Sequence, residues 1–94
     1  MFSPELRAGV ARGDITLTVR LWRNAMVRVG SRYSRHGFEI EVDAIELLPF
    51  AEISEADVAR CGEVSREALR QRTAHAGPVH DDTPVYRIEF HATS

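Results

Sequence analysis

The stretch from Ile15 to Trp22, Ile-Thr-Leu-Thr-Val-Arg-Leu-Trp, is the clearest strand signal in the chain. Its aliphatic residues occupy every second position, which is the period of a strand with one buried face. The positions between them carry two hydroxyls, a guanidinium and an indole, an unusual set for a face that only contacts water: Thr16, Thr18, Arg20 and Trp22. We therefore expect a strand here, and its polar face is the leading candidate for a binding site.

The residues before this strand predict a short helix. Ser3 can cap the first turn, Pro4 suits the first helical position, and Glu5 lies near the positive end of the helix dipole. Gly13 is well placed to end the helix. A short helix is therefore expected to lead directly into the strand.

Two further strands are expected downstream. Residues 27–33 read as a strand interrupted near Gly30, where a bulge is easily accommodated. In residues 38–47 the apolar positions change phase after Ala44, so one long strand must contain a bulge or a bend. Bends of this kind allow a small sheet to curl into a barrel.

Two short helices are predicted before the last strand. Ser54 caps the first one, with Asp57 in the reciprocal position of a capping box, and Ser65 caps the second. Residues 85–91 alternate again and form the closing strand. Strands separated by a helical insertion, with a leading helix, indicate an α+β domain with a barrel-like sheet.

Length and composition favour one globular domain. The chain has 94 residues, of which 44% are hydrophobic and 28% charged, so it can bury a modest core and does not resemble a disordered segment. We find no signal peptide and no membrane span, which predicts a cytoplasmic protein that does not enter a membrane. The single cysteine, Cys61, cannot form an internal disulfide, and we expect it to be a small buried residue.

Charge is distributed unevenly along the chain. All 12 basic residues are arginine, which reflects either a compositional bias or selection for bidentate phosphate contacts. Residues 1–35 carry seven arginines against two carboxylates, and residues 36–94 carry five arginines against twelve. This asymmetry indicates either a face that binds a polyanion or two halves that pair with each other.

Several short motifs, taken in order, resemble the ASCH domain family of the PUA-like superfamily. The ASCH motif places glycine, lysine, a glutamate or threonine, and arginine at fixed spacing, and three of its four positions fit, at Gly13, Thr18 and Arg20. Further segments follow in the order typical of the family: Val29-Gly30-Ser31-Arg32-Tyr33, Ile40-Glu41-Val42, Pro49-Phe50 and Val85-Tyr86-Arg87-Ile88-Glu89-Phe90. The resemblance implies one ASCH-like domain over residues 1–94, with a PUA-like small β-barrel, a short N-terminal helix and two short helices before the last strand.

The resemblance also implies a candidate catalytic site. Some small bacterial ASCH proteins are amidohydrolases that act on acetylated cytidine through a lysine, a threonine and a glutamate, and ribonuclease activity is ascribed to others. Thr18 matches the nucleophilic threonine, but Ile15 stands at the lysine position and the chain contains no lysine. A gapless comparison places Cys61 at the glutamate position, and a shift of two places Glu63 there.

Catalysis by Thr18 would need a new base. A threonine hydroxyl is a poor nucleophile unless a neighbouring group removes its proton, and Ile15 cannot do so. A replacement base would have to come from elsewhere in the chain: Glu41, Asp43, Glu63 or a histidine. We therefore favour a protein that is not an enzyme, with a substituted nucleoside amidohydrolase or ribonuclease as the alternative.

The partner implied by the resemblance is RNA or a nucleotide, held in a cleft with Arg20 at its centre. Arginines would track the backbone, and Trp22 or Tyr33 would stack on an unpaired base. The arginines proposed for this track are Arg23, Arg28, Arg32 and Arg35. Two alternatives stay open: Arg20 is an ion-pair partner of the neighbouring long strand, through Glu39, Glu41 or Asp43, or the domain is a scaffold for protein interactions.

Metal binding is not expected. The four histidines have no spacing typical of a zinc or iron site, and only His80-Asp81-Asp82 resembles a loop that could collect an ion. We therefore predict no metal and no cofactor, while the oligomeric state cannot be deduced from the sequence.

Overall fold

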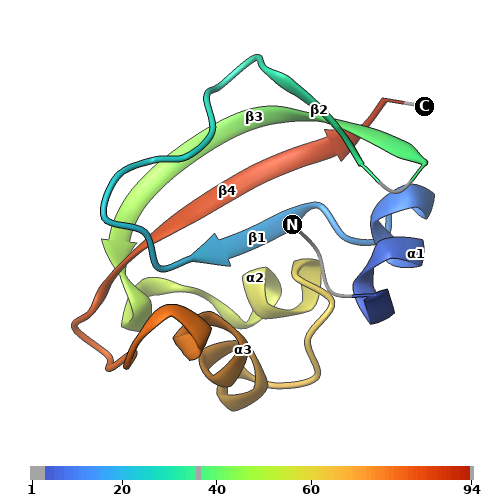
Figure 1. Ribbon diagram of the computed structural model, residues 1–94. Coiled ribbons are helices and arrows are strands. Elements are labelled where there is room, and N and C mark those ends of the chain that lie inside the picture. Colours follow the sequence, from blue (N-terminus) through green and yellow to red (C-terminus); the bar gives the residue numbers. More distant parts are fainter. Residues whose placement is uncertain (1–3, 36, 94) are drawn as a thin grey trace.

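The computed structural model describes residues 4–35 and 37–93 (Figure 1). The alternating stretch forms β1 (Leu17–Arg20), in which Leu17 and Val19 are buried as predicted. The expected leading helix is α1 (Pro4–Arg12), and it ends at Gly13, whose φ of 84° lies in the left-handed region that favours glycine. Ser3, the predicted cap, lies outside the described residues. Both N-terminal predictions about element type are therefore confirmed.

The strands form one antiparallel sheet in the order β1-β4-β3-β2. β2 (Arg32–Arg35) and β3 (Phe38–Pro49) form a hairpin, and β4 (Pro84–Ala92) returns to lie between β3 and β1. The neighbour of β1 is therefore the last strand and not the long strand β3 that we expected. This order places one complete strand between β1 and the acidic residues of β3.

The predicted bulge is present in β3. The register against β4 shifts between Val42 and Ala44, which leaves Asp43 without a partner in the ladder. Figure 1 shows that β3 and β4 curve together. The phase change in the sequence therefore identified a real bend.

The predicted closure into a barrel is not confirmed. In the described residues the sheet is open, with β1 and β2 at its edges. The segment 21–31 between them does not form a long strand but crosses the sheet, where Val27 packs with Val42 and Ile88. Backbone bonds from this segment to β3 are limited to Gly30 and Ser31, both with Val42.

The two helices before β4 form a corner beside β1. They are α2 (Glu55–Arg60) and α3 (Arg66–Thr73), flanked by the short 3₁₀ turns η1 (Phe50–Glu52) and η2 (Ala74–Ala76). The capping box of Ser54 and Asp57 and the cap at Ser65 are both present, as predicted. Within the described part of the chain, no helix has the length and apolar character needed to cross a membrane.

The core joins this corner to the sheet. Leu17, Val19 and Val85 of the sheet pack with Val58 and Leu69 of the two helices. A second apolar cluster lies under α1, and its buried members are Val10, Ile15, Phe38, Ile40 and Phe90. The corner is thereby held next to the edge strand β1, and a cleft lies between them.

Candidate functional site

A cleft of about 730 Å³ runs along the edge of β1 that faces away from β4. Every residue from Leu17 to Trp22 lines it, and consecutive strand residues can do so only where a cleft follows the strand edge. The opposite wall comes from the helical corner, through Cys61, Glu63, Leu69, Gln71, Arg72 and His75. The cleft therefore lies between elements distant in sequence.

Arg20 lies in this cleft and is anchored on its own strand. Its Nε donates a hydrogen bond to Thr18 Oγ1 at 3.0 Å. Burial lowers the pKa of Arg20, the nearby Cys61 opposes this effect, and repulsion from Arg72 adds to it. Because arginine has so high an ordinary pKa, the side chain keeps its positive charge at neutral pH.

Cys61 lies at the base of the cleft, at the C-terminal end of α2. The side chain is buried, as predicted, and burial raises the pKa of its thiol to about 12, with further contributions from Asp57 and Glu63. The nucleophilic form of cysteine is the thiolate, which is scarce at neutral pH when the pKa is so high. Cys61 therefore contributes packing to the cleft and no reactive group.

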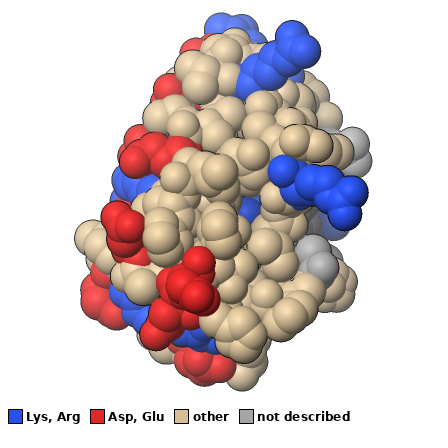
Figure 2. All heavy atoms as spheres, turned by 90° about the vertical axis from the view of Figure 1, so that its left-hand side faces the viewer, with Lys and Arg blue, Asp and Glu red and all other residues tan. Residues whose placement is uncertain are grey.

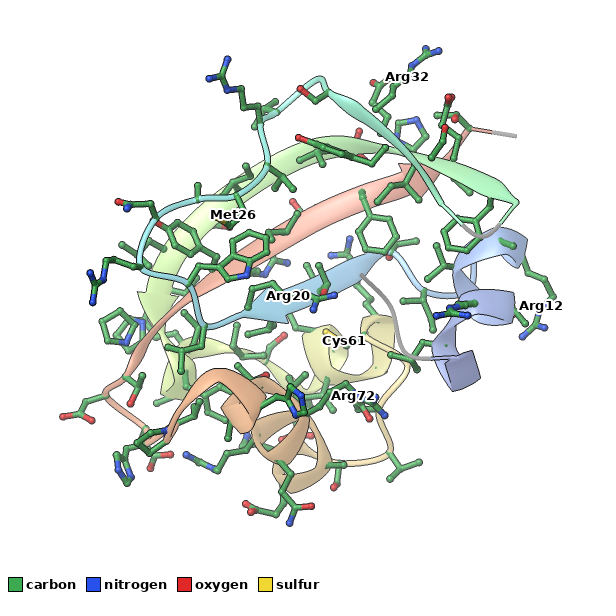
Figure 3. The ribbon with its side chains drawn as sticks, viewed as in Figure 1. Arg12, Arg20, Met26, Arg32, Cys61 and Arg72 are labelled. Atoms are coloured by element: carbon green, nitrogen blue, oxygen red, sulfur yellow. The ribbon has the colours of Figure 1, made fainter. Side chains whose placement is uncertain are left out.

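Glu63 and Arg72 form an ion pair inside the cleft. Arg72 Nε donates to Glu63 Oε2, and the Glu63 side chain is only 7% exposed. Figure 3 shows Arg20 of β1, Cys61 and Arg72 of α3 near one another between β1 and the helices, whereas Arg32 lies at the top of the view and Arg12 at its right. The arrangement thus brings two guanidiniums and one carboxylate into one cleft.

Of the four residues on the predicted polar face of the first strand, three line the cleft and one does not. Thr18, Arg20 and Trp22 line the cleft, and Trp22 also packs at a tilted angle on Tyr86, with ring centroids 6.0 Å apart. Thr16 does not belong to the lining, because its hydroxyl accepts a hydrogen bond from Arg60 Nε at 3.0 Å. Thr16 thereby joins the start of the strand to α2.

The other predicted binding residues lie outside the cleft lining. Arg23 is exposed on the segment that follows Trp22, and Arg32 pairs with Glu41 at 3.0 Å on the far edge of the sheet. Tyr33 packs on the sheet, and its hydroxyl accepts a hydrogen bond from the Arg28 amide. The predicted arginine track is therefore not continuous with Arg20.

The acidic residues of the long strand do not lie on the strand next to Arg20 and Thr18, because β4 lies between β1 and β3. Glu39 instead contacts Thr93, Ser34 and Arg32, Glu41 contacts Arg32, and Asp43 contacts His91. The alternative in which Arg20 pairs with Glu39, Glu41 or Asp43 assumed that the long strand is the neighbour of β1, and that assumption was wrong. The error follows from assuming that strands close in sequence are neighbours in the sheet.

Three cleft residues escaped the sequence analysis: Gln71, Arg72 and His75. They belong to α3 and the turn after it, and as polar positions of a predicted helix they resemble any solvated helix face. Leu69 and Thr73 are the buried residues of α3, and they define its inner face. The direction in which α3 packs against β1 could not be read from the sequence.

Ile15, at the lysine position of the ASCH motif, is part of the core. It is 6% exposed and fills the space above two glycines, where a Cβ built on Gly9 or Gly62 would come within 2.7 Å or 2.6 Å of Ile15 Cδ1. No amine can therefore approach Thr18 from this position.

The structure brings together one set of potential metal ligands that the sequence did not indicate. Ligand atoms of Glu41, Asp43 and His91 lie within 4.8 Å of one another on the exposed face of the sheet. His91 Nδ1 lies 2.9 Å from Asp43, and Glu41 is paired with Arg32, so each group already has a protein partner. The expected absence of a metal stays a prediction.

The arginines of the acidic half of the chain form ion pairs with carboxylates of that same half. All five arginines of residues 36–94 pair with carboxylates of the same half: Arg60–Glu89, Arg66–Glu55, Arg70–Asp81, Arg72–Glu63 and Arg87–Asp57. Figure 2 shows acidic side chains gathered along one side of the face that it presents, with arginines among them, while arginines on the other side stand apart from carboxylates.

Comparison with known proteins supports the fold. No family model matches the sequence, and no curated protein matches it closely. The crystal structure of an ASCH domain from Lactobacillus crispatus JV V101 is similar over 98% of this chain and 76% of that one, with a TM-score of 0.75 and 18% sequence identity. Thus the chain, as the motif order predicted, has the fold of an ASCH domain.

Proposed function

We propose that this domain binds RNA or a nucleotide in the cleft between β1 and the helical corner. The observation that carries the proposal is that Arg20, at the end of β1, and Trp22, just after it, line the same cleft as Arg72 of α3. Guanidiniums bind phosphate through charge-assisted hydrogen bonds, and an indole offers a stacking surface for an unpaired base. Such a combination suits a nucleotide better than a purely apolar or purely charged ligand.

Rigidity adds to the suitability of this site. Arg20 is held on a strand and anchored through Nε to Thr18, so less side-chain freedom is lost when a ligand binds. Trp22 is likewise held against Tyr86. Sequence-specific RNA recognition commonly uses unpaired bases stacked on aromatic side chains, which a cleft of this size can accept.

The geometry favours binding over the alternative of an amidohydrolase or ribonuclease. Thr18 Oγ1 accepts a hydrogen bond from Arg20, and a charged guanidinium cannot remove a proton from a hydroxyl. Glu63 lies in the same cleft but is engaged by Arg72, and Cys61 is protonated at neutral pH. For Thr18 to act as a nucleophile with Glu63 as its base, Glu63 would have to leave Arg72 and reach the Thr18 hydroxyl.

Intrinsic fluorescence gives a direct test, because the chain contains a single tryptophan and that tryptophan lines the cleft. We expect single-stranded RNA or nucleotides to change the emission of Trp22, with an affinity that falls as salt rises. Arg20→Gln should weaken binding about tenfold, whereas Arg12→Gln, on an exposed arginine outside the cleft, should not.

Two outcomes would count against the proposal. One is the absence of salt-dependent RNA binding together with no thermal stabilisation by any nucleotide or nucleoside. The other is equal loss of affinity in the Arg20 and Arg12 variants. Turnover of acetylcytidine that Thr18→Ala abolishes would instead favour the enzyme.

A further inference from the structure

The pairing of β1 with β4 sets the direction of every main-chain group in β1. Phe90 N donates to Thr16 O at 3.0 Å, and these two residues lie opposite each other when the register of the ladder is extended by one position. In an antiparallel pair, hydrogen-bonded positions alternate with positions that are not hydrogen-bonded. Leu17 and Val19 are therefore positions of the second kind, and their N–H and C=O groups point away from β4.

The edge of β1 that carries these groups borders the cleft. Figure 1 shows β4 on one side of β1 and the helices α2 and α3 on the other, and both Leu17 and Val19 line the cleft. Val19 is only 5% exposed, and buried main-chain groups are almost always hydrogen-bonded. Among the described residues we find no hydrogen bond to the N–H or C=O of Val19. The wall of the cleft therefore presents one donor and one acceptor, from the same residue, with which a ligand can pair.

This donor and acceptor match the edge of a nucleobase. Every nucleobase has neighbouring donors and acceptors on its Watson–Crick edge, and proteins that recognise single-stranded RNA hydrogen-bond to that edge. A base paired with a strand edge continues the plane of the sheet, so its two faces lie toward side chains from opposite faces of β1. In the cleft these are Trp22 on one side and Leu69, which packs with Val19, on the other. Both side chains can contact a flat aromatic ring.

An extended peptide is the other class of ligand that pairs with a strand edge. Such a peptide needs a row of outward main-chain groups. The strand β1 has only four residues, of which two point outward, and one of these, Leu17, is only 1% exposed. The pair of groups at Val19 is therefore better suited to a base than to a peptide.

We infer that the main chain of Val19 binds the Watson–Crick edge of a nucleobase, with the N–H donating to an acceptor of the base and the C=O accepting from a donor. This inference rests on the proposed function and specifies which part of the ligand the strand contacts. A side-chain substitution leaves both main-chain groups in place. The tests therefore change the base and observe the Val19 amide directly.

The first test compares nucleotides of equal charge, by Trp22 emission and isothermal titration. Each common 5′-monophosphate is compared with an uncharged-base analogue methylated on its Watson–Crick edge: the monophosphate of 3-methyluridine, N4,N4-dimethylcytidine, N6,N6-dimethyladenosine or 1-methylguanosine. We expect the edge methyl groups to weaken binding at least about tenfold, because they remove a donor and leave the main chain of Val19 unpaired. The matched controls are 5-methyl pyrimidines and 7-deaza purines, which keep the Watson–Crick edge and should bind like their parents.

The second test follows single amides by NMR hydrogen exchange. In the protein without ligand, the Val19 amide should exchange faster than the amides of Thr18 and Arg20, which belong to the ladder with β4. Saturation with a nucleotide that binds should slow the exchange of Val19 at least about tenfold relative to those two amides. The two ladder amides are the internal control, because they respond only to a general gain in stability.

The outcomes separate the two proposals. Edge-methylated nucleotides that bind as tightly as their parents would overturn the inference while leaving nucleotide binding intact. A Val19 amide that exchanges as slowly as that of Thr18 without ligand would also overturn it, because the N–H would then already have a partner. If a peptide with the sequence of β4 (Pro84–Ala92) slowed the exchange of Val19 where nucleotides did not, the edge would belong to a peptide instead. If no nucleotide and no RNA binds, the proposed function itself fails.

Discussion

The ion pair between Asp57 and Arg87 holds the helical corner against the sheet, and its removal gives the sharpest test of the fold. Arg87 Nε and Nη2 donate to the two carboxylate oxygens of Asp57 at 2.9 Å and 2.8 Å. The side chains are 11% and 14% exposed, so the pair is largely withdrawn from water. Since α2 leads to Cys61 and Glu63, this contact also positions one wall of the cleft.

The expected cost follows from this geometry. Hydrogen bonds to charged groups contribute about 1.5–3 kcal/mol each, and removing one partner of a buried pair costs about 3–5 kcal/mol. Glu46 and Glu89 lie 3.2 Å and 3.4 Å from Arg87, so its charge keeps two carboxylate partners when Asp57 is replaced. We therefore expect Asp57→Asn to lower the free energy of unfolding by about 3 kcal/mol, near the lower end of that range. This loss is a large share of the total free energy of unfolding, which is about 5–15 kcal/mol for a typical small domain.

The assay is urea unfolding of a double-mutant cycle with Asp57→Asn and Arg87→Met. The pair Arg12–Asp14 is the matched control, because its N–O distance is also 2.9 Å but its side chains are 66% and 65% exposed. We expect a coupling energy of only about 0.2–1 kcal/mol between the two side chains of this exposed pair. Similar coupling energies in the two cycles would refute the reasoning, because burial would then not determine the strength.

The same pair predicts a dependence on pH. The hydrogen bond from Arg87 holds the pKa of Asp57 below its ordinary value, with a smaller opposing effect of burial. A lowered pKa means that the stabilisation is complete above the ordinary aspartate pKa of about 3.9 and is lost as pH falls through the folded-state pKa. The wild type should therefore lose stability more steeply than Asp57→Asn below about pH 4.

Three further predictions concern other parts of the molecule. Gly62→Ala should destabilise the domain more than Gly13→Ala in thermal unfolding, because both glycines have positive φ but only at Gly62 would a Cβ meet Ile15, at 2.6 Å. The Cys61 thiol, with its pKa raised to about 12, should react with a disulfide reagent at pH 8 far more slowly in the folded protein than in urea, and equal rates would contradict its burial. A hydrogen bond from His91 to Asp43 raises the pKa of His91. The stabilisation from this pair is therefore complete below the ordinary histidine pKa, and it is lost as the pH rises through the raised pKa of His91. Asp43→Asn should therefore lower the pKa of His91 in an NMR titration, and an unchanged value would exclude the contact.

The sequence alone determined most of the elements, but not all of their ends: residues 27–33 were predicted as a strand, whereas β2 is Arg32–Arg35. The strand of Thr18 and Arg20, a bulge or bend in the long strand, and the capping box of Ser54 were all predicted and are all present, with the bulge between Val42 and Ala44. These features depend on residues two to four positions apart, which interact within one strand or one helical turn. Local spacing is sufficient to predict them.

Only the tertiary structure decided which elements meet. The position of β4 beside β1 separates Arg20 from the acidic residues of β3, and the open sheet replaces the expected barrel. The packing of α3 brings Arg72 into the cleft, and the approach of Arg60 withdraws Thr16 from it. These contacts join residues far apart in sequence, and they depend on how buried faces pack together, which a pattern of polar and apolar positions leaves undetermined.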